Sequence, residues 1–129
     1  MERRLYQRIP VQVAAVVAVD GGAAGIKVVA VDVSSDGLGI ECDIRQRNMI
    51  TPGGSYIRNG KPVSVMVDLE LPDTDGQSIK IVARCLVAFS RRMSNDLCKI
   101  GLRYVDFESS SREWLVQFVE RRRASLYSQ

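Results

Sequence analysis

The strongest constraint on the fold is a series of short runs rich in β-branched residues, each closed by turn-forming residues. Valine and isoleucine dominate these runs, and apolar side chains do not recur in them at the 3.6-residue period of a helix. Glycine, proline, aspartate, asparagine and serine separate one run from the next, and these residues favour tight reversals of the chain. The pattern predicts strands joined by turns. The predicted strands cover residues 11–19, 26–34, 38–42, 62–71, 77–90 and 97–107.

These strands predict an all-β domain, a small antiparallel β-barrel of six or seven strands. Closing a small sheet into a barrel removes the exposed edges that could pair with other chains. The period then changes: apolar residues recur at three- and four-residue spacing, after Ser110 and Glu113 in the arrangement of a capping box. We therefore expect a C-terminal α-helix over about residues 110–127, with Trp114 and Phe118 packed over an open end or face of the barrel.

The domain organisation follows from length and from one proline. The 129 residues are enough for one domain with its own core. Three arginines lie among the first nine residues, and Pro10, which restricts the residue before it, marks a boundary. We predict a flexible basic arm over residues 1–9 and a single barrel domain over residues 10–129. Polar residues, proline and glycines fill residues 43–61, which predicts a long loop there.

The composition excludes several kinds of chemistry. The chain has no histidine, which rules out Ser-His-Asp and Cys-His catalysis and imidazole metal sites. The cysteines, Cys42, Cys85 and Cys98, are odd in number and form no Cys-x-x-Cys pair, so we expect buried free thiols in a reducing cytoplasm. The longest apolar stretch, residues 11–19, is too short for a membrane helix, and no signal peptide is evident. We predict a cytoplasmic protein that is not an enzyme and has no metal or cofactor.

Two groups of polar residues stand in a distinctive order along the chain. The arm carries Arg4 and Arg8, four positions apart, with Arg3 directly before them. Downstream, the turn between the second and third predicted strands reads Asp-Val-Ser-Ser-Asp-Gly over residues 32–37. An Arg-x-x-x-Arg motif followed by Asp-x-Ser-x-x-Gly on an all-β chain resembles the PilZ domain. The resemblance covers nearly the whole chain, roughly residues 3–120, and implies the PilZ-like split barrel.

The resemblance implies a receptor for the bacterial second messenger cyclic di-GMP, an anion with two phosphates and two guanines. Six residues are expected to bind it: Arg3, Arg4, Arg8, Asp32, Ser34 and Gly37. A planar guanidinium binds phosphate oxygens or a guanine edge through two hydrogen bonds. The Asp32 carboxylate accepts from guanine N1–H and N2–H, and the Ser34 hydroxyl donates or accepts. Gly37 is expected to let the backbone turn tightly beside the base.

The resemblance also bears on stoichiometry and output. In PilZ domains an arginine just before the motif, here Arg3, is associated with an intercalated pair of ligand molecules, so two ligands per chain are expected. Ligand binding is expected to fold the arm over the barrel and to signal to an unidentified protein partner. Phe89 is expected to be a core or rim aromatic rather than a cover for a guanine.

Two other classes of function stay open. One is a PilZ-like protein-interaction module that binds no nucleotide. The other is a barrel that binds single-stranded nucleic acid, which is disfavoured because such barrels stack bases on aromatic side chains and only 6% of residues here are aromatic. The net charge of +3 suits an anionic ligand but is small for a protein dedicated to duplex nucleic acid.

Overall fold

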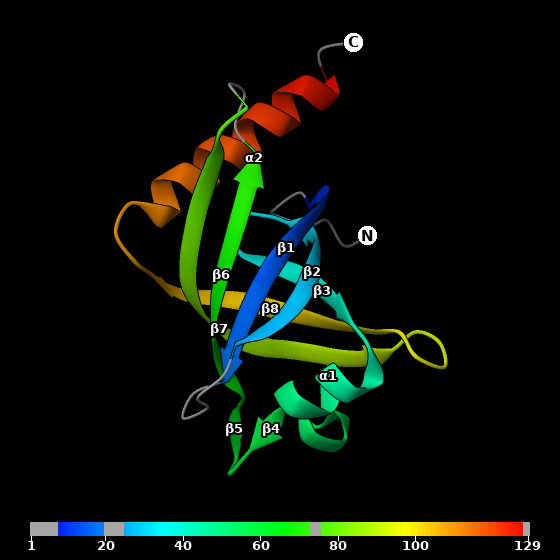
Figure 1. Cartoon of the computed structure of the whole chain (residues 1–129). Helices are drawn as coiled ribbons and strands as arrows, with labels where there is room; N and C mark the ends of the chain where they lie inside the picture. Colours follow the sequence, from blue (N-terminus) through cyan, green and yellow to red (C-terminus); the bar gives the residue numbers. More distant parts are fainter. Residues whose placement is uncertain (1–7, 20–24, 73–75, 128–129) are drawn as a thin grey trace, which may run out of the picture.

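A closed six-stranded antiparallel barrel forms the body of the protein (Figure 1). The computed structural model describes residues 8–19, 25–72 and 76–127. The barrel strands are β1 (Ile9–Val19), β2 (Ile26–Val33), β3 (Gly37–Cys42), β6 (Ser64–Pro72), β7 (Ser78–Arg92) and β8 (Cys98–Phe107). Around the barrel they follow the order β1-β2-β3-β8-β7-β6, and β1 and β6 pair to close it. The all-β antiparallel barrel predicted from the sequence is confirmed.

The barrel interior is filled by alternate residues of each strand, because successive side chains of a strand point to opposite faces of the sheet. On β6, for example, Val65, Val67, Leu69 and Leu71 are each at most 2% exposed. Alternation of this kind leaves the intervening residues on the outer face, where a ligand can reach them.

All three cysteines are free and buried in this interior, as the sequence predicts. Burial raises the pKa of the Cys42 and Cys85 thiols to about 12. These thiols are therefore protonated and unreactive near neutral pH.

Helix α2 (Ser111–Tyr127) packs against β7 and β1. Leu115, Phe118 and Val119 are buried, at positions that share one face of a helix. Trp114, in contrast, is 40% exposed. The expectation that Trp114 covers the barrel is therefore wrong, because the buried face of α2 is formed by those three residues together with Ser111.

The segment over residues 43–61 is not the long loop that we expected. It forms α1 (Ile44–Ile50) and a single 3₁₀ turn. Asp43 caps α1. The backbone N–H of Gln46 donates to the Asp43 carboxylate at 2.7 Å, and the backbone N–H of Asp43 donates to the Gln46 side-chain oxygen at 3.0 Å. This is a capping box, and its sequence signal, aspartate followed three residues later by glutamine, was missed. Ile50, at 0% exposed, anchors the helix to the core.

The same segment ends in a small hairpin of β4 (Ile57–Arg58) and β5 (Lys61–Pro62). Asn59 and Gly60 form its tip, both with positive φ, as a type I′ hairpin turn requires. Figure 1 places α1 and the hairpin together beyond one end of the barrel, away from α2. Within the part of the chain that the structure describes, neither helix has the length and apolar character needed to cross a bilayer.

Candidate functional site

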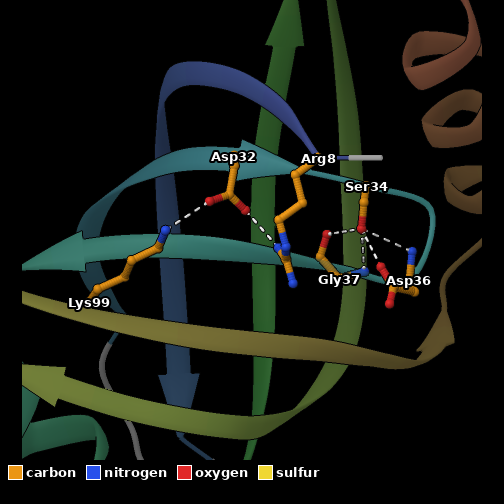
Figure 2. A network of polar contacts seen from close by, with 6 residues as sticks. All are labelled: Arg8, Asp32, Ser34, Asp36, Gly37 and Lys99. Atoms are coloured by element: carbon orange, nitrogen blue, oxygen red, sulfur yellow. Dashed lines mark hydrogen bonds and ion pairs between the residues drawn. The ribbon is translucent and has the colours of Figure 1, made fainter. Parts of the chain in front are cut away.

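An ion pair joins the start of the barrel to the Asp-x-Ser-x-x-Gly segment (Figure 2). The Arg8 Nη1 donates to Asp32 Oδ1 at 2.7 Å. Strands β1 and β2 pair with Ile9 opposite Val33 and Pro10 opposite Asp32. That register brings Arg8, which directly precedes β1, beside a carboxylate 24 positions away in the sequence. Strand β1 begins at Ile9, one residue inside the arm predicted over residues 1–9.

A second cation binds the other oxygen of the same carboxylate. Lys99, on β8, donates from Nζ to Asp32 Oδ2 at 3.1 Å. Burial of the Asp32 side chain, which is 13% exposed, raises its pKa. The hydrogen bonds and positive charges of Lys99 and Arg8 outweigh burial and hold the pKa of Asp32 below its ordinary value. Asp32 is therefore a stable carboxylate at neutral pH, able to accept hydrogen bonds and unable to donate them.

Sequence reasoning did not find Lys99, because nothing near it in the sequence marks it. It lies 67 positions from Asp32, and only the order of the strands around the barrel brings the two residues together. Strand β3 separates β2 from β8, so the Lys99 side chain reaches Asp32 across β3.

Gly39 of β3 leaves room for the contact between Lys99 and Asp32, and its role was not predicted from the sequence either. It lies opposite Asp32 on one side and Gly101 on the other. A Cβ at Gly39 would stand 2.7 Å from Asp32 Oδ2 and 3.0 Å from Lys99 Cε. The two side chains therefore meet over a residue that has no side chain of its own.

The turn between β2 and β3 is held together by the hydroxyl of Ser34. Ser34 is 0% exposed. Its Oγ donates to the Asp36 carboxylate and accepts from the amides of Asp36 and Gly37 at 3.3 and 3.2 Å. The Ser34 amide in turn donates to the Gly37 carbonyl at 2.8 Å. Ser34 thus binds its own turn, as Figure 2 shows, and its hydroxyl is directed into the protein.

The structure requires a glycine at position 37 for a different reason from the tight turn that we expected. The described glycines with positive φ are Gly53, Gly54, Gly60 and Gly76, so Gly37 is not at a left-handed turn position. A Cβ at Gly37 would overlap the carbonyl oxygen of Leu102 on β8. Glycine is required here because the backbones of β3 and β8 approach closely.

On the far side of Gly39 the outer face of the barrel carries an aromatic ring. The Phe89 ring, half-buried on β7, lies over Gly101, where a Cβ would stand 2.6 Å from Phe89 Cδ2. The Arg91 guanidinium lies 5.5 Å from the centre of that ring. The Asp32 carboxylate with its two cations therefore lies on one side of the two glycines, and the Phe89 ring with Arg91 lies on the other. Arg3 and Arg4, expected to complete the site, lie outside the described residues.

A comparison with known families identifies the domain. A family model described as PilZ domain matches residues 2–121. The chain belongs to the PilZ domain family. The resemblance drawn from the two motifs is thereby confirmed. PilZ domains are generally non-enzymatic binding domains, and no catalytic family is indicated for this one.

Two solved structures are similar to this PilZ domain. Inhibitor of motility (MotI/DgrA) from Bacillus subtilis matches with a TM-score of 0.70 and 17% identity, over 97% of this chain and 53% of that one. The present chain thus spans about half the length of that protein. The PilZ domain of YcgR from Escherichia coli, solved with c-di-GMP, matches with a TM-score of 0.54 and 12% identity, over 99% of both chains. Both likenesses concern the fold. No curated protein matches the chain.

Proposed function

We propose that this PilZ domain is a non-enzymatic receptor for cyclic di-GMP. The proposed binding site comprises Arg3, Arg4, Arg8, Asp32, Ser34 and Gly37. The observation that carries the proposal is the 2.7 Å ion pair between Arg8 and Asp32. It joins the second arginine of Arg-x-x-x-Arg to the aspartate of Asp-x-Ser-x-x-Gly, so one residue of each motif meets the other on the outer face. The similarity in fold to the YcgR domain, which was solved with c-di-GMP, supports the same ligand.

Each side chain has a role that fits this anion. An arginine has five N–H donors in a planar fork. Arg8, which donates from Nη1 to Asp32, turns this fork toward a phosphate when the ligand binds. The Asp32 carboxylate accepts the N1–H and N2–H of guanine, which adenine does not offer in that arrangement. Ser34 and Gly37 contribute by holding the β2–β3 turn and the approach of β3 to β8.

We infer that the phosphates draw Arg3 and Arg4 onto the barrel together with the rest of residues 1–7. Ordering the arm in this way changes the surface that a downstream protein partner contacts. Three arginines before β1 offer three guanidinium groups to the four phosphates of a stacked pair of ligands, and we propose two cyclic di-GMP molecules per chain.

Isothermal titration calorimetry with cyclic di-GMP tests this proposal directly. We expect saturable heat, a stoichiometry of two, and no comparable heat from cyclic di-AMP, which carries the same phosphates without guanine. A flat trace with cyclic di-GMP contradicts the receptor function and favours the nucleotide-independent interaction module. A salt-dependent response to a single-stranded oligonucleotide, without one to cyclic di-GMP, favours the nucleic-acid barrel instead.

A further inference from the structure

The carboxylate of Asp32 is bound by cations from two different parts of the molecule. Arg8 comes from the segment before β1 and binds Oδ1, whereas Lys99 is the second residue of β8 and binds Oδ2 (Figure 2). Arg8 belongs to the Arg-x-x-x-Arg motif, and Lys99 belongs to neither motif. The two cations therefore need not respond to a ligand in the same way.

Arg8 has two possible anionic partners once a ligand is bound. Under the proposed function its guanidinium turns toward a phosphate, and Oδ1 of Asp32 becomes free for the guanine. That change removes one of the two positive charges beside a carboxylate that is 13% exposed, and brings phosphate anions close to it. Burial and like charges both favour the protonated form of a carboxyl group. A protonated Asp32 carries an O–H donor in place of one acceptor, so it no longer accepts hydrogen bonds from both N1–H and N2–H of guanine.

Lys99 has the geometry to prevent this loss. Its backbone is fixed in β8, directly opposite Glu41 of β3 and Arg91 of β7. Its ammonium nevertheless bonds Asp32, one strand further away, rather than the acidic residue opposite. The side chain is only 24% exposed and crosses β3 over Gly39. Lys99 thus stays on Asp32 independently of the segment before β1.

We propose that Lys99 is a positioning residue of the cyclic di-GMP site. It keeps the Asp32 carboxylate ionised and oriented through Oδ2 after Arg8 has left Oδ1 for the ligand. This inference rests on the proposed function and adds to it a cation outside both motifs. Its role differs from that of the arginines, because Lys99 acts on the ligand through Asp32.

The other charged and titratable groups near Asp32 cannot replace Lys99 as the cation that keeps the carboxylate ionised. The other charged or titratable side chains beside this network are Asp36 of the turn, Tyr104 of β8, and Glu41 and Arg91, which lie opposite Lys99 on β3 and β7. Burial raises the pKa of Tyr104 well above its ordinary value, so Tyr104 stays neutral near pH 7 and adds no negative charge beside Asp32. The two acidic residues add negative charge. Arg91 lies over the Phe89 ring, and the described cations that hydrogen-bond Asp32 are Arg8 and Lys99, so Lys99 is the one that remains when Arg8 moves.

The test compares Lys99→Met, which removes the charge, with Lys99→Arg, which keeps it. Lys80→Met is the matched control, because Lys80 forms a similar ion pair with Asp68 at 3.3 Å on the exposed face of β6 and β7. Calorimetry with cyclic di-GMP is run on the full chain from about pH 8 to about pH 4. We expect Lys99→Met to bind about 10- to 100-fold more weakly at neutral pH. Its binding also fails at a higher pH than in the unmodified protein, since Asp32 accepts a proton sooner. Lys99→Arg and Lys80→Met retain the original pH profile.

Several outcomes overturn the inference. If Lys99→Met binds as tightly as the unmodified protein at every pH, or more tightly, Lys99 does not position Asp32. Equal weakening at every pH, with a smaller salt dependence, indicates a direct phosphate contact instead. A flat trace for the unmodified protein is a different result, which refutes the proposed function itself. Carbon-13 NMR of the Asp32 carboxyl in the ligand-bound, unmodified protein needs no variant, and a protonated carboxyl near neutral pH overturns the inference.

Discussion

Gly39 and Gly101 lie directly opposite each other on β3 and β8. A Cβ on Gly39 would crowd the Asp32 carboxylate, and one on Gly101 would overlap the Phe89 ring. The two glycines therefore leave room on the outer face for side chains that arrive from β2 and β7. A carboxylate, its two cations and an aromatic ring are held close together by this gap in the side-chain layer.

Gly39→Ala and Gly37→Ala are expected to have different effects, the first on ligand affinity and the second on the stability of the fold. At Gly39 the new Cβ meets side-chain atoms of Asp32 and Lys99, which can move, so the fold survives and cyclic di-GMP affinity falls about tenfold as the ion pair is displaced. At Gly37 the Cβ meets the Leu102 backbone, which cannot move cheaply, so the free energy of unfolding falls by about 1–3 kcal/mol. Urea unfolding and calorimetry on both variants separate the two effects. Equal loss of stability in both variants contradicts the interpretation.

Ser34→Ala is expected to destabilise the protein by about 1–3 kcal/mol, because it leaves buried amides of the turn without their acceptor. Ligand binding weakens as a consequence of the altered turn. Chemical denaturation gives the stability change, and Ser35→Ala, one position along the same turn, is the control. Unchanged stability with lost binding shows instead that the Ser34 hydroxyl contacts the ligand directly.

Arg8→Ala is expected to abolish cyclic di-GMP binding and to leave the melting temperature of the unliganded protein almost unchanged. The ion pair it breaks is partly exposed, with Arg8 at 32%, and contributes about 1 kcal/mol at most. Thermal unfolding and calorimetry measure the two quantities. Arg45→Ala, which removes an exposed arginine from α1, is the control and retains binding. Loss of the fold in Arg8→Ala indicates a structural role for this arginine.

The stability that Asp32 contributes is expected to depend on pH. Its folded pKa is held below its ordinary value by Lys99 and Arg8, against the effect of burial. A carboxyl of this kind stabilises the fold above its unfolded pKa, and the contribution disappears as the pH falls through the folded pKa. Asp32→Asn therefore lowers the free energy of unfolding near pH 7, and the difference shrinks below about pH 4. Denaturation curves at both pH values measure it. A difference that stays constant with pH rules out ionisation of Asp32 as its source.

Local patterns in the sequence predicted much of the fold. Alternating β-branched runs are a property of each strand alone, and their ends agree with β1, β2, β3, β6, β7 and β8 within two residues. The capping box at Asp43 and Gln46 is equally local, so α1 was also predictable from the sequence. The exposed position of Trp114 was not predictable in this way, because helical spacing identifies an apolar face without showing which edge of that face meets the barrel.

The sequence by itself determined the strands, the C-terminal helix and the two motifs, because each depends on residues close together in the chain. It also named Arg8 and Asp32 as members of one site. The tertiary structure alone decided that Lys99 binds the second oxygen of Asp32 and that Gly39 leaves room for this contact. Those contacts depend on strand order and register around a closed barrel, where residues 67 positions apart become neighbours. Pairing across three strands leaves no periodic signal at any one of them.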